Sequence, residues 1–377
     1  MHENRPCSLR FEAVMETLHG YGISTTHYLQ LHYGHAHGWF ALASEAADLR
    51  TTFLLFFPIC FHLHTAVGVK LLWVAVVGDW INLVLKWILF GERPYWWIQE
   101  TLYYGNSTVP QIQQFPTTCE TGPGSPSGHA MGAAGVYYAM VTSLMPVLLK
   151  GDGDPVKKWC VHGCLWMLFW AIQIAVCLSR IFIAAHFPHQ VITGVVTGIA
   201  VAKVFNRASW IHSATLRSYF NTTFFLLSFA LGLYTLLDAT SIDPHWSLVK
   251  AQRWCLHPDW VHLDTTPFAG LLRNTGALFG LGLSLHLSML MEPETCGYRD
   301  GAIYRLSCAL VTLLLLSLLD SFRPPAHTQA LFYILSFCKS ATVPLTTVGF
   351  VPFCATAALN VYQRKKCLQS SKLHHSS

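Results

Sequence analysis

Three short polar segments stand out in an otherwise apolar chain. They are KWILFGERP at 86–94, PSGH at 126–129 and SRIFIAAHFPHQ at 179–190. Arginine and lysine bind phosphate oxygens, and histidine can act as a nucleophile or as an acid and base near neutral pH. A phosphoryl transfer needs cations, a nucleophile and a proton donor for the leaving oxygen. The segments supply this set in five residues: Lys86, Arg93, His129, Arg180 and His186.

The residues 122–129, GPGSPSGH, are expected to form a loop of small residues that leads into a helix. Glycines let backbone N–H groups approach a ligand, and a helix N-terminus suits an anion. Nothing in the set demands a metal, and the twelve cysteines show no paired zinc spacing. Taken singly, each segment also fits a plain structural role, such as a lysine beside an interfacial aromatic belt or a surface histidine.

The composition predicts a membrane protein. Of 377 residues 53% are hydrophobic and 11% charged, whereas soluble domains average roughly 25% charged residues. Apolar stretches near span length recur, so we expect an all-α polytopic bundle of about nine transmembrane helices. The expected spans are residues 39–63, 71–90, 128–149, 159–179, 184–203, 218–237, 266–290, 303–321 and 330–352. The net charge of +5 is mild and gives no indication of nucleic-acid binding.

These spans divide the chain into a lumenal N-terminal segment at 1–38, a single integral-membrane phosphatase domain at 39–355 and a cytosolic tail at 356–377. Residues 1–38 lack a signal-peptide pattern, so the first span is expected to act as an uncleaved signal anchor. Half of the twelve cysteines fall inside the expected spans, which argues against a disulfide framework.

The distribution of Lys and Arg predicts the orientation. With a lumenal N-terminus, the cytosolic segments carry about twice as many Lys and Arg as the lumenal ones, as the positive-inside rule requires. The sequon at Asn106 then falls in the lumenal loop 91–127, where it can be glycosylated, and the sequon at Asn221 falls on the cytosolic side and is expected to stay unused. The three polar segments all meet at the lumenal face.

The segments resemble the signature K-x6-RP, PSGH and SR-x5-H-x3-D of the type-2 phosphatidic acid phosphatase and vanadium haloperoxidase superfamily. From about residue 19 to about residue 355 the chain is also similar to glucose-6-phosphatase catalytic subunits. This similarity is carried by GDW at 78–80, CETGPGSPSGHAMG at 119–132, AAHFPHQV at 184–191, HLDTTPFAG at 262–270 and FCKSA at 337–341.

The resemblance implies a role for each site residue. His186 would form a phosphohistidine, and His129 would protonate the leaving sugar oxygen and then activate water. Five residues would hold the phosphate: Lys86, Arg93, Arg180, Ser127 and Gly128. The implied reaction is hydrolysis of glucose 6-phosphate to glucose and phosphate without a cofactor, the final step of gluconeogenesis and glycogenolysis. The family works in the lumen of the endoplasmic reticulum, so a glucose-6-phosphate transporter must supply the substrate.

Two positions depart from the pattern. Gln190 stands where the wider superfamily has the Asp that orients the nucleophile, and we hypothesise that Asp48 or Asp79 takes over this role. The alternative is that Asp79 only pairs with Lys86, seven residues further on. In the tail, eleven residues follow the lysine pair 365–366, so a terminal dilysine retrieval signal is lacking.

Three other functions remain possible from the sequence. A lipid phosphate phosphatase of the same superfamily would usually have about six spans. For a low-activity or regulatory paralogue, the five intact key side chains argue against an inactive enzyme but do not set its rate. A transporter would have polar residues spread through its later spans, which are mostly apolar here. Within the family, a single sequence does not separate the liver and kidney type from the islet type, although it looks closer to the former.

Overall fold

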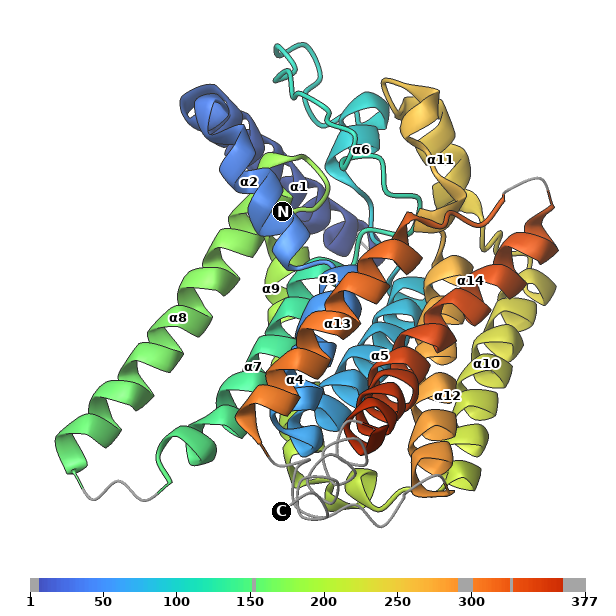
Figure 1. The fold of residues 1–377 in the computed structure, drawn as a ribbon. Coiled ribbons are helices and arrows are strands. Elements are labelled where there is room, and N and C mark those ends of the chain that lie inside the picture. Colours follow the sequence, from blue (N-terminus) through green and yellow to red (C-terminus); the bar gives the residue numbers. More distant parts are fainter. Residues whose placement is uncertain (1–6, 151–153, 291–300, 326–327, 362–377) are drawn as a thin grey trace, which may run out of the picture. The chain divides into compact units, whose positions relative to one another are not determined.

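In a computed structural model, residues 7–150, 154–290, 301–325 and 328–361 are described, and they form helices joined by loops (Figure 1). No strand occurs in these ranges, which confirms the all-α class. Most of the predicted tail, residues 362–377 with the lysine pair, lies outside the described residues, as do residues 1–6.

Long helices coincide with eight of the nine predicted spans in the described part of the chain. They are α5 (Thr65–Leu89), α7 (Gly128–Leu148), α8 (Pro155–Phe182), α9 (Pro188–Arg207), α10 (Leu216–Ala239), α12 (Pro267–Leu290), α13 (Ala302–Ser321) and α14 (Gln329–Pro344). Among the described helices, seven are long and apolar enough to cross a membrane, or up to eight if one bent pair is a single span. The count of nine is therefore not confirmed, and α12 is the helix outside this set.

The first predicted span, 39–63, is broken at Asp48. Helix α2 (His37–Ala46) ends before it and the short α3 (Leu49–Thr51) begins after it, followed by α4 (Phe57–Leu63). Asp48 adopts an extended conformation and its carboxylate accepts a hydrogen bond of 2.8 Å from the backbone N–H of Arg50. This is the geometry of a helix N-cap, so a charge inside the predicted span starts a new helix there.

The N-terminal segment, which the sequence analysis left without structure, contains a helix of 27 residues, α1 (Cys7–Tyr33). One face of α1 is buried at Ile23 and Thr26. The hydroxyl of Thr26 donates to the carbonyl oxygen of Ile181 at 3.2 Å. Helix α1 thus packs against the C-terminal end of α8.

The chain forms two compact units. The first comprises 1–52, 73–209 and 226–271, and the second comprises 53–72, 210–225 and 272–377. All three polar segments lie in the first unit. In the second unit α4 and α13 pack together, and the imidazole of His62 is 2.9 Å from the hydroxyl of Thr312.

Helices α7 and α9 of the first unit lie side by side (Figure 1). Small residues allow this close approach. A Cβ on Gly198 would collide with the carbonyl oxygen of Met131, and a Cβ on Gly135 would lie 3.4 Å from the carbonyl oxygen of Gly198. Since α7 begins next to His129 and α9 begins just after His186, this packing fixes the separation of the two histidines.

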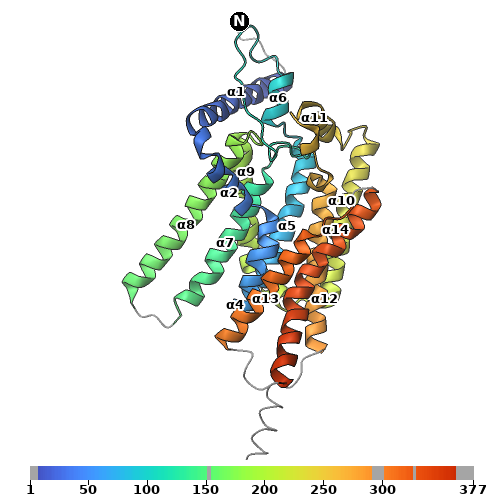
Figure 2. The same cartoon turned by 45° about the horizontal axis from the view of Figure 1, so that its top comes forward.

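Two short helices, α6 (Pro94–Glu100) and α11 (Trp246–Trp254), lie near each other at one end of the first unit (Figure 2). A disulfide between Cys119 and Cys255 joins the loops that follow them. The sequence argued against a disulfide framework, and this single bond forms between two cysteines that lie in connecting loops and not in spans. The bond spans 136 residues, and closing a loop of this size stabilises the fold by about 4–5 kcal/mol in the chain-entropy account.

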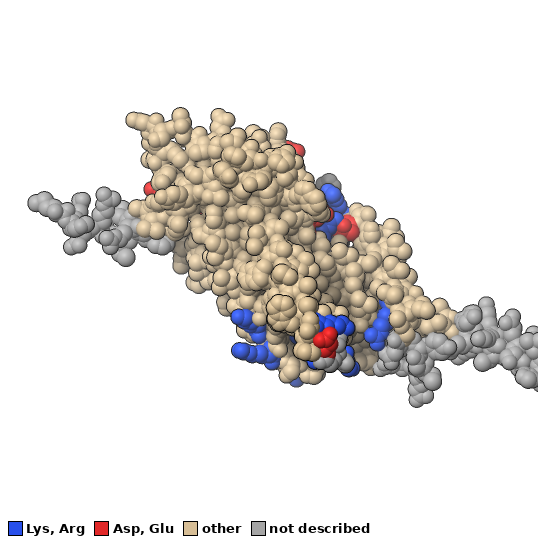
Figure 3. Space-filling model, turned by 90° about the vertical axis from the view of Figure 1, so that its left-hand side faces the viewer, with Lys and Arg blue, Asp and Glu red and all other residues tan. Residues whose placement is uncertain are grey.

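Helix α8 exposes large apolar side chains along its length, among them Trp159, Met167, Trp170 and Ile174. Figure 3 shows the side of the molecule on which α8 lies, with an extensive uncharged surface and basic side chains at its lower edge. Lys157 at the start of α8 is exposed. A helix that faces lipid exposes apolar side chains along its length and places charged side chains at its end. Helix α8 has both features, which agrees with the prediction of a membrane protein.

Candidate active site

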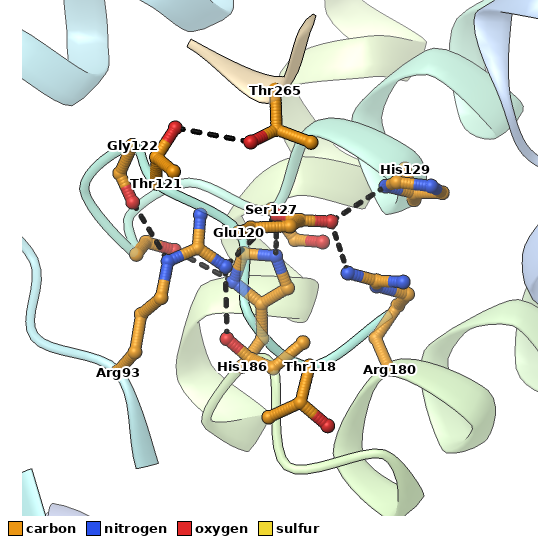
Figure 4. A network of polar contacts seen from close by, with 12 residues as sticks. Arg93, Thr118, Glu120, Thr121, Gly122, Ser127, His129, Arg180, His186 and Thr265 are labelled. Carbon is orange, nitrogen blue, oxygen red and sulfur yellow. Dashed lines mark hydrogen bonds and ion pairs between the residues drawn. The ribbon is translucent and has the colours of Figure 1, made fainter. Parts of the chain in front are cut away.

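Every residue of the predicted phosphate site lies at a helix end or close to one. Arg93 is the N-cap of α6, and Ser127 is the N-cap of α7, which puts His129 in its first turn. Arg180 lies in the last turn of α8, and His186 follows in the loop that precedes α9. The structure brings the two arginines and two histidines together, as the sequence analysis expected (Figure 4).

At the centre of this group lies Glu120, which the sequence analysis did not single out (Figure 4). Its Oε2 is 2.9 Å from a guanidinium nitrogen of Arg93 and 3.6 Å from Nε2 of His186. Its Oε1 pairs with Arg180 and is 3.5 Å from Nδ1 of His129. One signal was present in the sequence: Glu120 is the only acidic residue in the loop segment 101–127, beside a site rich in cations.

The charge of Glu120 is fixed by its neighbours. Burial alone would raise the pKa of its carboxyl group, but the charges of Arg180 and Arg93 outweigh burial and hold this pKa well below its usual range. The carboxylate is therefore ionised at neutral pH. It neutralises part of the charge of two arginines whose side chains are 0% and 1% exposed.

His186 is completely buried, and its two ring nitrogens have different roles. Nδ1 lies 2.8 Å from the carbonyl oxygen of Gly124, and a carbonyl oxygen can only accept, so Nδ1 carries the proton. Nε2 finds no hydrogen-bond partner among the described residues. Burial, together with the charge of Arg93, lowers the pKa of His186 to about 3. The ring is thus neutral at pH 7, with the lone pair of Nε2 directed into the site.

The carbonyl group of Gly124 takes the place that we expected Asp48 or Asp79 to fill. Gln190 supports it: its Oε1 lies 3.3 Å from Nδ1 of His186, and its Nε2 donates to the carbonyl oxygen of Glu92 at 2.7 Å. The expectation of an orienting carboxylate is therefore wrong, because two neutral acceptors hold the ring. Asp48 instead caps α3.

Backbone carbonyl groups hold Arg93 rigidly. Its Nε donates to Gly122 at 2.7 Å, and its terminal nitrogens donate to Ala185 at 3.1 Å and Pro123 at 3.3 Å. These contacts join the loop before α7 to the loop before α9. A guanidinium that is fixed before the ligand arrives loses little entropy when it binds phosphate oxygens.

Arg180 and Lys86 complete the cationic wall. Arg180 donates to the hydroxyl of Ser44 at 2.8 Å, which fixes the guanidinium from α2. The ammonium group of Lys86, in the last turn of α5, lies 3.6 Å from the point where a Cβ on Gly122 would stand. Lys86 therefore borders the same loop that Arg93 holds.

Ser127 and Gly128 differ from each other in what they can offer a phosphate. The N–H of Ser127 already donates to the carbonyl oxygen of Gln190 at 3.1 Å, so a contribution of Ser127 would come from its hydroxyl group. A Cβ on Gly128 would lie 3.2 Å from the amide oxygen of Asn82 on α5. Gly128 thus lets the start of α7 approach α5 closely.

The two sequons lie on different elements. Asn106 is exposed in a turn of the loop after α6, and Asn221 is exposed on α10. Within the residues that the structure describes, no cluster of three or more His, Cys, Asp or Glu side chains is placed to hold a metal ion.

Comparison with known proteins identifies the family. The profile of the PAP2 superfamily matches residues 67–214, which contain all three polar segments. Glucose-6-phosphatase catalytic subunit 1 of Felis catus is 56% identical over 355 residues, covering 94% of this chain and 99% of the relative. Glucose-6-phosphatase 2 of Homo sapiens is 48% identical over 345 residues, covering 90% and 96%. None of the solved structures matches the chain. The chain belongs to the family of glucose-6-phosphatase catalytic subunits.

Proposed function

We propose that this chain hydrolyses glucose 6-phosphate to glucose and phosphate through a phosphohistidine at His186, the final step of gluconeogenesis and glycogenolysis. The names of its relatives indicate that the substrate is this sugar phosphate. One observation carries the chemistry. Nε2 of His186 is buried and unpartnered among the described residues. It faces the carboxylate of Glu120, an anion that pairs with Arg93 and Arg180.

In the first step, the lone pair of Nε2 of His186 attacks the phosphorus atom. The bond between phosphorus and the sugar oxygen breaks, and this oxygen takes a proton from the imidazolium form of His129, so glucose leaves as a neutral alcohol. Arg93, Arg180 and Lys86 balance the charge on the phosphoryl oxygens. The hydrogen bond from Nδ1 to Gly124 stabilises the positive charge that develops on the ring.

In the second step, His129, now neutral, takes a proton from a water molecule as that water attacks the phosphorus atom. The bond between nitrogen and phosphorus breaks, and its electron pair returns to Nε2. Phosphate then leaves, and both histidines regain their starting states. The side chain of His129 is 24% exposed while that of His186 is buried, which suits a group that must meet both the sugar and water.

The test compares wild type with His186→Ala, using His189→Ala as the matched control. Detergent-permeabilised microsomes receive glucose 6-phosphate and lysophosphatidic acid in parallel, and labelled phosphohistidine is trapped without acid. We expect wild type and His189→Ala to release glucose and carry the label, and His186→Ala to do neither. Preference for the lipid would replace glucose 6-phosphate with a lipid substrate. Cleavage of neither substrate would favour a regulatory paralogue.

The same proposal places the chain in the membrane of the endoplasmic reticulum, with its active site and N-terminus in the lumen and its C-terminus in the cytosol. Two features support this orientation. Disulfides form in oxidising compartments, and the bond between Cys119 and Cys255 adjoins the site. Asn106, the expected glycosylation site, is exposed in the loop that leads to Cys119.

The orientation has its own test, which is independent of activity. Removal of N-glycans should increase the mobility of wild type and of Asn221→Gln but leave Asn106→Gln unchanged. A shift that depends on Asn221 would reverse the orientation, and a tagged chain at the plasma membrane would overturn the compartment. If a transporter supplies the substrate, intact microsomes should hydrolyse glucose 6-phosphate more slowly when that transporter is blocked, and permeabilised ones should not.

A further inference from the structure

The carboxylate of Glu120 lies where the phosphoryl group must stand. Its Oε2 is 3.6 Å from Nε2 of His186, on the side of the free lone pair. A reacting phosphorus atom has to approach this nitrogen to about 3–3.5 Å in line with that lone pair. A carboxylate oxygen and a phosphoryl group cannot both fill this space. Substrate therefore cannot reach the attacking position until the side chain of Glu120 moves.

The contacts of this carboxylate also have the pattern of a bound phosphate. Oε2 lies between Arg93 and His186, and Oε1 lies between Arg180 and His129 (Figure 4). Each oxygen thus touches one guanidinium and one imidazole. Two oxygens of a phosphoryl group are also anionic and lie at a similar spacing, so they could take the same places between the two arginines and the two histidines.

We propose that Glu120 is an internal competitor of the phosphate group, which holds Arg93 and Arg180 in place in the free enzyme and is displaced when the substrate binds. The inference rests on the proposed phosphoryl transfer at this site. It gives Glu120 a positioning role, because the carboxylate keeps two buried cations paired until the substrate takes over.

The backbone around Glu120 is fixed, so the side chain alone must move. The carbonyl oxygen of Glu120 accepts a hydrogen bond of 3.0 Å from the hydroxyl of Tyr95. The next carbonyl, that of Thr121, accepts one of 2.9 Å from Ser247, and the preceding residue is Cys119 of the disulfide. The side chain of Glu120 is 19% exposed, whereas that of Arg93 is fully buried. Rotation of the Glu120 side chain toward solvent frees the site, and the backbone of the loop does not have to change.

The proposal makes opposite demands on the free and the bound enzyme. Glu120→Gln removes the counter-charge of two buried arginines, so the free enzyme should lose stability. The same change removes the competitor, so an added oxyanion should bind more tightly. A carboxylate that stayed beside the bound phosphate for another purpose would not produce this pair of effects.

The experiment uses the purified full-length chain in detergent and titrates orthovanadate, an oxyanion without a sugar, while thermal unfolding is recorded. Glu100→Gln is the matched control, because Glu100 pairs with Lys250 at 2.8 Å away from the phosphate site. For Glu120→Gln we expect a lower unfolding temperature without vanadate, and a vanadate dissociation constant lower by on the order of tenfold, the usual scale of one charge-assisted contact. Glu100→Gln should bind vanadate as wild type does.

Weaker vanadate binding by Glu120→Gln would overturn the proposal, because it would show that the carboxylate helps to hold the anion. Unchanged binding would also overturn it, because it would show that the carboxylate does not occupy the place of the anion. If Glu120→Gln is not recovered, Glu120→Asp carries the test, since its shorter side chain keeps the charge but cannot reach both arginines. It should also bind vanadate more tightly, and weaker binding would again overturn the proposal. The titration needs no turnover, so a wrong sugar substrate would leave its result unaffected.

Discussion

Nδ1 of His186 and the carbonyl oxygen of Gly124 are joined by a hydrogen bond of 2.8 Å. A main-chain carbonyl group cannot accept a proton at any working pH, so it orients the ring without taking part in proton transfer. Gln190 lies beside this bond, and its amide group is itself held by the carbonyl oxygen of Glu92. The proposed nucleophile is therefore held by neutral groups, which do not raise its low pKa.

A carboxylate at position 190 should disturb the nucleophile through its charge. In Gln190→Glu, a negative charge next to Nδ1 raises the pKa of His186, and the hydrogen bond to Glu92 is lost. We expect kcat to fall by about tenfold, the scale of one hydrogen bond of this kind, and the acid limb of the kcat/KM profile to move to higher pH. Gln190→Met is the neutral control and should lower activity without moving that limb. A profile that shifts equally in both variants would contradict the charge argument.

A side chain at Gly124 should displace the carbonyl group that orients His186. A Cβ there would collide with the carbonyl oxygen of Glu92 and lie 2.9 Å from Nε2 of Gln190. Gly124→Ala should reduce kcat by about 10²-fold, as small displacements of catalytic groups do. Gly163→Ala, on α8, meets open space and should retain full activity. Both variants are assayed for glucose release; full activity in Gly124→Ala would show that the carbonyl position is not critical.

The hydroxyl of Ser44 should matter for binding through Arg180. In Ser44→Ala the guanidinium loses a buried hydrogen bond of 2.8 Å and becomes freer to rotate. We expect KM to rise by about three- to tenfold, in keeping with about 1 kcal/mol for such a bond. Ser179→Ala is the control, because this hydroxyl donates to the carbonyl oxygen of Phe40. It should lower the unfolding temperature and leave KM unchanged, and an equal rise of KM in both variants would argue against a specific role of Ser44.

The disulfide should stabilise the loop that carries Glu120. Cys255→Ser leaves Cys119 without its partner and opens a loop of 136 residues. We expect a loss of about 2–5 kcal/mol in the free energy of unfolding, seen as a lower unfolding temperature, and a matching sensitivity of wild type to reductant. Cys160→Ser removes an exposed free thiol and should have no effect. If reductant does not destabilise wild type, the bond contributes nothing measurable.

Acid should weaken the fold through His186. The pKa of His186 is about 3 in the folded chain, whereas an unfolded histidine has a pKa near 6.5. Between these values the unfolded chain binds a proton that the folded chain excludes, so the free energy of unfolding falls as pH falls from about 6.5. Thermal unfolding of wild type and His186→Asn between pH 7.5 and 5 measures this. The variant should show a shallower slope, and parallel slopes would mean that His186 is already charged in the fold.

Much of the site was predictable because it depends on local pattern. Apolar stretches near span length gave the long helices, and their alternation across the bilayer put Arg93, His129, Arg180 and His186 at one face. The residue types then indicated phosphoryl chemistry. Helix α1 was not predicted, because residues 7–33 contain no apolar stretch long enough to indicate a transmembrane span.

The sequence by itself predicted which side chains gather at one site and the phosphoryl chemistry that they could support. Only the tertiary structure decided what stands between them. The carbonyl of Gly124 is a backbone group that every residue possesses, so no residue type could identify it as the partner of His186. Glu120 meets Arg180 across 60 residues, and Cys119 meets Cys255 across 136. Such contacts depend on how loops fold back over the helix ends, and the periodicity that specifies a helix carries no information about that path.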